Sequence, residues 1–555
     1  MNIKSVLGTV LAIGALWSSR AAEYDIVIKN GRVMDPETKL DAVCSVGIKD
    51  GVIRVITKEN IEGKELIDAA GLVVAPGFID GHQHCLDPYV YRLMVRDGRT
   101  TIMDLEIGAP GTEVNRFYEK CKGKTPINLG VAVSHEFARA EVLDGYREWN
   151  YLHTPDAVKS RVGEDWSKKR PTLKEGNQIL SIIDEGLRQG GIGIGSTVGY
   201  MREGVSSREI FELQRLGGLY GRQIGMHFRN SPGNDVEEVL GIQEMIANSA
   251  ALGTPAIAMH FNNPGYNMVH ELIIRMQERG YNIWGELYPY RAGSTALNAV
   301  FLEPEVWVDK LGNKYEDTVM DVETGEFFTR ESREEMLKKD PTRLVVIYKM
   351  PEDAVLDWIK LPNVAIGSDG MPLIPDKGLK WDTPYEELPN AHPRLSGSFA
   401  KVLRMAREND IPLMQAVAMT SYNTAKPLGD MGLKAMQVRG RIQTGMVADV
   451  TVFNPKTVKD NATYKRGTVP SSGILHVIVN GIVVMRDEVP LERFDAGQPI
   501  RFAPQKEGKF KPLDKEHWTK KFYVLPKKSD FGGSSGLGCC NLKSMCDDKN
   551  ACSKE

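Results

Sequence analysis

The sequence predicts an α/β protein whose central part is a (β/α)8 barrel. Short apolar runs follow one another through the middle of the chain, and helical stretches lie between them. Each run ends at polar or ionisable residues, as the strands of such barrels do where an active site forms. The eight runs are GFIDGHQH, TTIMDLE, INLGVAVSH, GIGIGST, QIGMHFR, PAIAMHF, YNIWGELYPY and NVAIGSDG.

The segments on either side of this region have the pattern of β-hairpins. YDIVIKNGRVMDP and CSVGIKDGVIRVI alternate apolar and polar residues around Asn-Gly and Asp-Gly pairs, which are typical of tight turns. A matching pair, DVTVFNP and GILHVIVNGIVVMRD, occurs far downstream. We therefore expect one small β domain built from residues 23–76 and 430–490, with the barrel at residues 77–429.

Two further segments stand apart from these domains. The connection between the seventh and eighth runs, residues 301–362, is long and contains a helical piece (RESREEMLKK) and a strand-like piece (TRLVVIY), so we expect an insertion or lid. Residues 491–555 form a C-terminal extension that ends in a tail expected to be flexible. Four cysteines crowd that tail, which in an exported protein favours disulfides over a zinc knuckle: Cys539, Cys540, Cys546 and Cys552.

The bulk composition is that of a globular protein. Of 555 residues, 42% are hydrophobic and 26% charged, and the net charge of −3 gives no reason to expect a nucleic-acid partner. Residues 1–22 resemble a signal peptide: Lys4 precedes an apolar run, and small residues follow at Ala21 and Ala22. We expect cleavage there and a secreted or periplasmic protein with no membrane span; a buried first helix or an uncleaved anchor are the alternatives.

Two pairs of histidines at the ends of predicted strands indicate a metal site. His82 and His84 are two residues apart in an extended segment, so their side chains point to the same side. His227 and His260 each close one of two successive runs. Either one alone is more often a core residue, but the four together favour a divalent cation. His135 ends the third run.

Carboxylates occupy two other strand ends. Asp369 follows the last run, where a carboxylate beside a metal can accept a proton from water and later protonate a leaving group; an ordinary Asp-Gly turn is the alternative. Glu106 ends the second run. The residues themselves thus indicate a metal-dependent hydrolase with Asp369 as its acid and base.

Longer stretches of the sequence resemble the D-aminoacylase (N-acyl-D-amino-acid deacylase) family of the amidohydrolase superfamily. They include PGFIDGHQH, MHFRN, GYNIWGELYPYRAGST, IGSDG, HPRLSGSF and TSYNTAKPLG…GRIQTGMVADVTVFNP. The resemblance implies a TIM-type barrel with a small β-sandwich domain, one or two zinc ions, and hydrolysis of an amide to a carboxylate and a free amine.

The resemblance also implies roles for individual residues. His82 and His84 would hold one metal position, His227 and His260 would hold the tighter one, and Asp369 would be a ligand and the catalytic acid and base. Tyr288, Ser294 and Arg394 match positions that contact the substrate in the family. Tyr200 lies near a fourth such position but is one residue out of register with it. An arginine such as Arg394 can bind a carboxylate through two hydrogen bonds.

The sequence departs from the family at two places. The family has a metal-bridging cysteine after the second strand, where this chain reads DLEIGAPG; Glu106 is the expected substitute, and Asp104 the alternative. The family also has a substrate-binding lysine after the sixth strand, where this chain has Asn262 in MHFNN. D-amino-acid specificity is therefore less firmly indicated than the reaction class.

These observations together predict the deacylation of an N-acyl-(D-)amino acid. Hydrolysis of a cyclic amide, a dipeptide or a lactone on the same scaffold is an alternative. A non-catalytic homologue that serves as a binding protein is another, and the missing cysteine favours it, whereas the retained histidines and aspartate do not. An oligomer is compatible with the sequence.

Overall fold

The computed structural model describes residues 23–149, 161, 163–229, 240–373 and 378–515. The predicted signal peptide and the cysteine-rich tail lie outside these residues, so both remain predictions. Two compact units are distinguished, residues 1–512 and 513–555, and everything below concerns the first. No helix within the described ranges is both long enough and apolar enough to cross a membrane.

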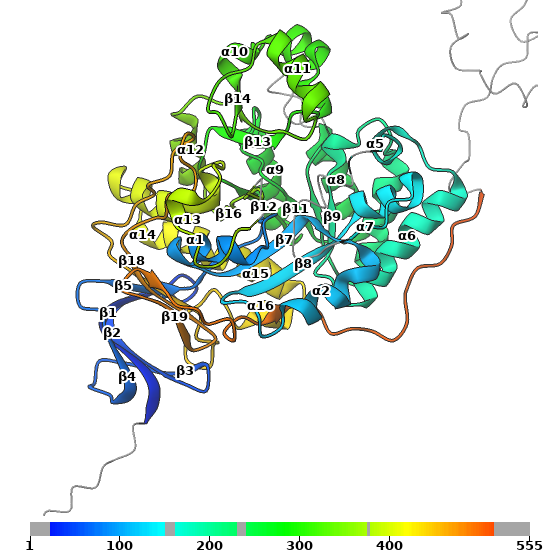
Figure 1. Cartoon of the computed structure of the whole chain (residues 1–555). Helices are drawn as coiled ribbons and strands as arrows, with labels where there is room; N and C mark the ends of the chain where they lie inside the picture. Colours follow the sequence, from blue (N-terminus) through cyan, green and yellow to red (C-terminus); the bar gives the residue numbers. More distant parts are fainter. Residues whose placement is uncertain (1–22, 150–160, 162, 230–239, 374–377, 516–555) are drawn as a thin grey trace, which may run out of the picture. The chain divides into compact units, whose positions relative to one another are not determined.

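Eight parallel strands form the predicted barrel, and each corresponds to one of the eight apolar runs (Figure 1). The sheet order is β16-β12-β11-β10-β9-β8-β7-β6. The segments that follow β6 and β16 are joined by a parallel bridge between Gln83 and Gly370 and by a hydrogen bond from Asp369 N to His82 O (2.6 Å). The bounds are β6 (Phe78–Asp80), β7 (Arg99–Ala109), β8 (Asn128–Ser134), β9 (Ile194–Ser196), β10 (Ile224–Met226), β11 (Ala256–Ala258), β12 (Ile283–Leu287) and β16 (Ala365–Ile366).

Helices alternate with these strands, as a (β/α)8 architecture requires. Large apolar side chains from the strands and from the last helices fill the barrel interior, among them Met103, Leu105, Met259 and Leu428. The principal helices are α1 (Tyr91–Arg96), α2 (Val114–Cys121), α3 (His135–Arg139), α6 (Leu173–Arg188), α7 (Ser207–Leu219), α8 (Leu240–Leu252), α9 (Tyr266–Glu278), α12 (Ala354–Lys360), α13 (Arg394–Glu408), α14 (Leu413–Val417), α15 (Asn423–Asp430) and α16 (Lys434–Gln437).

The two ends of the chain build one β domain, as predicted. Its strands follow the order β20-β19-β18-β17-β5-β1-β2-β3, and β4 pairs with β1. They form one continuous hydrogen-bonded path, and side chains from both ends of the chain meet in a shared core, for example Ile26 and Ile478. The bounds are β1 (Tyr24–Asp35), β2 (Leu40–Lys49), β3 (Val52–Thr57), β4 (Gly63–Asp68), β5 (Val73–Pro76), β17 (Val450–Phe453), β18 (Ile474–Val479), β19 (Ile482–Arg486) and β20 (Val489–Pro490).

One predicted hairpin turn in this domain is wrong. The Asn30-Gly31 pair lies inside β1 as a bulge, where the register with β2 shifts between Ile28 and Gly31. Asn30 has φ 61°, and a side chain at residue 31 would meet Val74 Cγ2 at 2.4 Å, so glycine is needed for close packing rather than for a turn. The other two pairs do connect adjacent strands, with positive φ at Asp50-Gly51 and at Asn480-Gly481.

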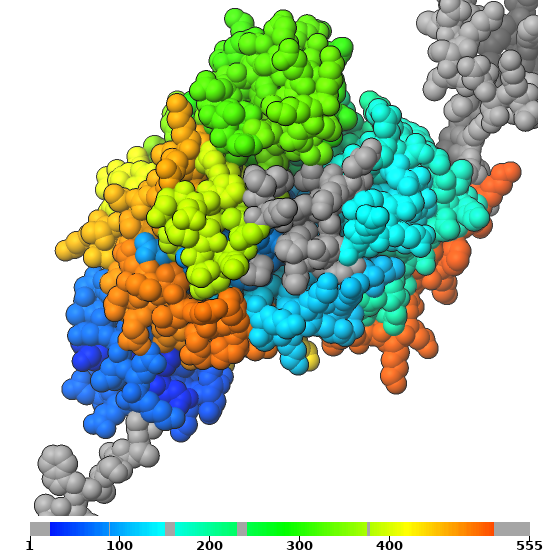
Figure 2. Space-filling view, in the orientation of Figure 1, coloured from blue at the N-terminus to red at the C-terminus, as the bar shows by residue number. Residues whose placement is uncertain are grey.

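The connection between β12 and β16 carries a sheet of its own, β13-β15-β14, and forms a rounded lobe drawn in green (Figure 2). Its elements are β13 (Ala292–Ala296), α10 (Tyr315–Thr318), β14 (Val319–Asp321), α11 (Arg330–Lys339) and β15 (Leu344–Tyr348). The helical and strand-like pieces are thus as predicted, but β13 precedes the expected start of the insertion at residue 301. In the C-terminal extension, β21 (Pro499–Ile500) pairs with β8.

Candidate metal centre and substrate cavity

The ends of five barrel strands bring together all six residues that the sequence marks as metal ligands. His82 and His84 follow β6, Glu106 lies near the end of β7, His227 follows β10, and His260 and Asp369 lie just beyond β11 and β16. They form two groups in which the ligand atoms lie within 4.8 Å of one another: His82, His84, Glu106 and Asp369, and Glu106, His227 and His260. All are buried.

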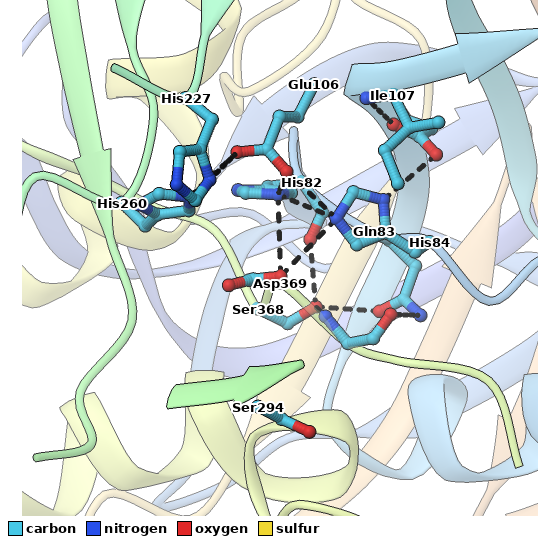
Figure 3. Close-up of polar contacts among 12 residues, drawn as sticks. His82, Gln83, His84, Glu106, Ile107, His227, His260, Ser294, Ser368 and Asp369 are labelled. Carbon is cyan, nitrogen blue, oxygen red and sulfur yellow. Dashed lines mark hydrogen bonds and ion pairs between the residues drawn. The ribbon is translucent and has the colours of Figure 1, made fainter. Parts of the chain in front are cut away.

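The first histidine pair is oriented by carboxylates that hold the outer ring nitrogens. His82 Nδ1 lies 2.7 Å from Glu286 Oε1, and His84 Nδ1 lies 3.1 Å from Asp104 Oδ2. Because a carboxylate only accepts hydrogen bonds, each Nδ1 carries a proton and each Nε2 is left to bind a metal. The two Nε2 atoms face each other at 3.0 Å (Figure 3).

The second pair also brings two ring nitrogens face to face, but the outer ring nitrogen of His260, Nδ1, is buried without a hydrogen-bond partner among the described residues. His227 Nδ1 and His260 Nε2 are 2.9 Å apart. The backbone N–H of His260 donates to Glu286 Oε1, the oxygen that also contacts His82, so one glutamate links the two pairs. Burial and the neighbouring His260 lower the pKa of His227 to about 4.

Glu106 lies between the two pairs and gives one oxygen to each (Figure 3). Its Oε2 is 3.2 Å from His82 Nε2 and 3.3 Å from His84 Nε2. Its Oε1 is 2.7 Å from His260 Nε2 and 3.3 Å from His227 Nδ1. Burial opposes ionisation, but the charges of His82 and His260 outweigh it and hold the pKa of Glu106 well below its usual range. This is the geometry of a carboxylate that can bridge two cations.

Asp369 connects the metal cluster to a cationic group. Its Oδ1 lies 3.4 Å from His84 Nε2, and its Oδ2 is 2.8 Å from Arg394 Nη1. Burial would raise the pKa of Asp369, but Arg394 and His82 outweigh burial and lower it, so the group is ionised at neutral pH. Asp369 (φ 50°) and His260 (φ 29°) both adopt the left-handed backbone region, which is strained for residues with a side chain.

The donor set fits divalent cations. Lone pairs of imidazole nitrogens that face each other at 2.9–3.0 Å repel unless a proton or a metal lies between them. Burial would lower the pKa of His82, but Glu106, Asp369 and Glu286 raise it to about 10, which shows a strongly negative site. Imidazole nitrogens and carboxylate oxygens together suit zinc, and a carboxylate is a harder ligand than the thiolate that the resemblance implies at this position.

The metal cluster borders a cavity that opens to solvent. Tyr200, Tyr288, Ser294 and Arg394, the four predicted substrate residues, all line it. Arg394 is the first residue of α13, whereas Ser294 comes from β13 of the insertion. Ser294 lies beyond Asp369 as seen from Glu106 in Figure 3.

Three side chains at the site were not identified from the sequence. The first is Glu286, which lies inside β12 and contacts both histidine pairs. Asp104, the predicted alternative to Glu106, instead contacts the outer ring nitrogen of His84. Lys349 and Arg161 line the cavity from segments without a recognisable motif. The pleat alternation of β12 could have indicated an inward Glu286; nothing in the sequence indicates the other two.

His135 is at a strand end, as predicted, but outside both metal groups. Its two ring nitrogens contact Ser196 Oγ (2.8 Å) and Glu209 Oε1 (2.9 Å). Asn262 is buried, and its amide donates to the backbone oxygen of Tyr288. It supplies no charge where the resemblance implies a lysine.

Comparisons with known proteins agree with this architecture. The chain is 26% identical to the D-aminoacylase of Alcaligenes xylosoxydans xylosoxydans over 501 residues, which are 85% of this chain and 96% of that protein. It is 25% identical over 525 residues to the N-acyl-D-glutamate deacylase of the same organism, with the same coverage. A crystal structure of N-acyl-D-glutamate deacylase from Bordetella bronchiseptica, complexed with zinc and a phosphonate inhibitor, has a TM-score of 0.69 and 23% identity and covers 86% of this chain and 99% of that one. No family model matches the chain.

The relatives, together with the barrel, the additional β domain and the buried His/Glu/Asp cluster, support an amidohydrolase enzyme. Within that class, the relatives support the predicted placement of this chain in the D-aminoacylase family. Glu106 lies where the resemblance implies a cysteine in the metal site.

Proposed function

We propose that this protein is a zinc-dependent deacylase of N-acyl-(D-)amino acids, which it converts to a carboxylate and a free amino acid. The proposal depends mainly on the position of Glu106. Its two carboxylate oxygens face the two histidine pairs in the wall of an open cavity. The D-aminoacylase and the N-acyl-D-glutamate deacylase match along 85% of this chain. This favours deacylation over hydrolysis of cyclic amides, dipeptides or lactones. The buried ligand set is complete, which disfavours a non-catalytic binding protein.

The residues that would hold zinc fall into two positions. His82, His84 and Asp369 would hold one ion, His227 and His260 the other, and Glu106 would serve both. When bound, zinc supplies Lewis-acid chemistry that lowers the pKa of water toward neutrality and stabilises negative charge on oxygen. Whether one or two ions are needed is decided by metal titration.

Asp369 is suited to move the proton of the reaction. Because its pKa lies below its usual range, Asp369 is a carboxylate at neutral pH. It can accept a proton from the attacking water at Oδ1, the oxygen that faces the metal cluster. Arg394 holds Oδ2 and so orients the carboxylate. The same proton can then be given to the departing nitrogen of the amide.

The replacement Asp369→Asn tests the assignment. The amide cannot accept the proton, so we expect kcat on an N-acyl amino acid to fall by at least about 100-fold. Zinc content, measured by inductively coupled plasma mass spectrometry, should stay near normal because the remaining ligands are intact. Retained turnover in this variant would exclude Asp369 as the base. A wild-type enzyme with no activity on a panel of N-acyl D- and L-amino acids would end the proposal as a whole.

A further inference from the structure

Lys349 lies in the cavity wall and forms no ion pair with any carboxylate of the described residues. It directly follows β15, so the insertion sheet carries it to the cavity that Asp369 and Arg394 also line. Its side chain is partly buried, and Nζ donates to Asn263 Oδ1 at 2.5 Å. In the described part of the chain, no carboxylate lies within the 4.0 Å of an ion pair to this ammonium group.

The surroundings of Lys349 disfavour its charge. Burial and the positive charge of Arg394, with weaker opposition from Asp369, Glu286 and Glu106, lower the pKa of Lys349 to about 7. Desolvating an ammonium group is costly unless an opposite charge compensates it. A bound anion would remove that cost.

Lys349 and Arg394 are neighbours at one part of the cavity. Both lie against the Tyr288 ring, with Arg394 Cζ 4.6 Å and Lys349 Nζ 5.2 Å from its centroid. Arg394 Nη2 also reaches the backbone oxygen of Ser294, whose residue lines the same cavity. Lys349, Arg394, Ser294 and Tyr288 all line the same cavity, and a carboxylate would be the complementary group for the two basic side chains.

Of the three cations that line the cavity, Lys349 alone has no ion-pair partner among the described residues, since Arg394 Nη1 already lies 2.8 Å from Asp369 Oδ2. Arg161 is paired with Glu136 through two contacts, Nε to Oε1 at 2.7 Å and Nη2 to Oε2 at 3.0 Å. Its charge is already compensated by a buried carboxylate. Lys349 is therefore the better candidate to bind an incoming anion.

We propose that Lys349 binds the α-carboxylate of the substrate together with Arg394, and that the insertion thereby determines which amides the enzyme accepts. The inference rests on the proposed deacylase function. It assigns to a lysine of the insertion sheet the anion contact that Asn262, on the barrel, cannot make. A substrate whose carboxylate is replaced by a neutral carboxamide would lose this interaction.

The test compares an N-acyl amino acid with its α-carboxamide in the zinc-loaded enzyme. Lys349→Met should raise KM for the acid by about 10- to 100-fold, the effect of one hydrogen bond to a charged group, while kcat changes little. For the carboxamide, both constants should stay at wild-type values. Lys349→Arg should keep most of the affinity for the acid, because the charge is retained.

A matched control is Lys339→Met, which removes an exposed lysine of α11 in the same insertion. This variant should leave KM and kcat unchanged for both the acid and the carboxamide. Equal losses on the acid and the carboxamide in Lys349→Met would mean that the lysine supports the fold, and an unchanged KM for the acid would mean that it does not bind the carboxylate. Either result overturns the inference. Wild-type enzyme that hydrolyses neither compound would instead refute the proposed function, which is measured before any variant.

Discussion

The two ends of the cavity are built from different parts of the molecule. At the metal end, histidines and carboxylates project from the ends of barrel strands, and negative charge raises the pKa of His82 to about 10. At the cationic end, Arg394 comes from the start of α13 and Lys349 from the insertion, and burial together with the charge of Arg394 lowers the pKa of Lys349 to about 7. One end is therefore suited to bind cations and activate water, and the other to bind an anionic substrate.

This difference separates the type of reaction from the choice of substrate. The metal end rests on hydrogen-bonded strands whose ends are held in place by the closed barrel. At the cationic end, Lys349 is carried by the insertion. The insertion has a three-stranded sheet of its own, so its sequence can vary without disturbing the barrel. Substitutions at the two ends should consequently affect different kinetic constants.

The largest effect is expected at the metal end from Glu106→Gln. The amide loses the negative charge that serves both positions, so zinc affinity should fall by more than the roughly 10- to 100-fold typical of an outer hydrogen-bond partner, and kcat should fall with it. Metal analysis after dialysis measures this loss. Glu119→Gln, on the exposed face of α2, is the control and should retain zinc. Unchanged zinc content in Glu106→Gln would show that the carboxylate does not bridge.

A smaller effect is expected from Glu286→Gln, which leaves every proposed ligand in place. The variant weakens the hydrogen bond that sets the His82 ring, so zinc affinity should fall by about 10- to 100-fold. KM measured at saturating zinc should change little, because the cationic end is untouched. Competition with a chelator gives the affinity, with the exposed Glu278→Gln of α9 as the reference. An unaltered affinity would leave Glu286 without a role in orienting the histidine.

The smallest effect is expected from pH at the cationic end. Lys349 has a pKa near 7 instead of 10.5, and a carboxylate binds best to its protonated form. Affinity should thus be complete below pH 7 and weaken by at most about tenfold per pH unit above it. KM for the acid measured from pH 6 to 9 should rise in the wild type and stay flat in Lys349→Met. A parallel rise in both would assign the titration to another group.

Much of the metal end could be predicted from the sequence. His82 and His84 share one side of an extended segment because side chains alternate along a strand, and the other ligands mark the ends of apolar runs. A parallel barrel brings such ends to one rim, so six separate positions become one site. Glu286 is not identified from the sequence because a glutamate inside a strand belongs to no motif. The Asn30-Gly31 pair predicts a turn but forms a bulge, because both structures require the same residues.

The barrel, the β domain from both chain ends and the six residues of the metal cluster could be predicted from the sequence, because hydrophobic period and strand-end chemistry are local properties. The three-dimensional structure was needed to show that Glu106 faces both histidine pairs, that Asp104 contacts His84, and that Lys349 reaches the cavity. Those outcomes depend on side chains brought together by distant strands and by the insertion, and no local pattern encodes which of them meet.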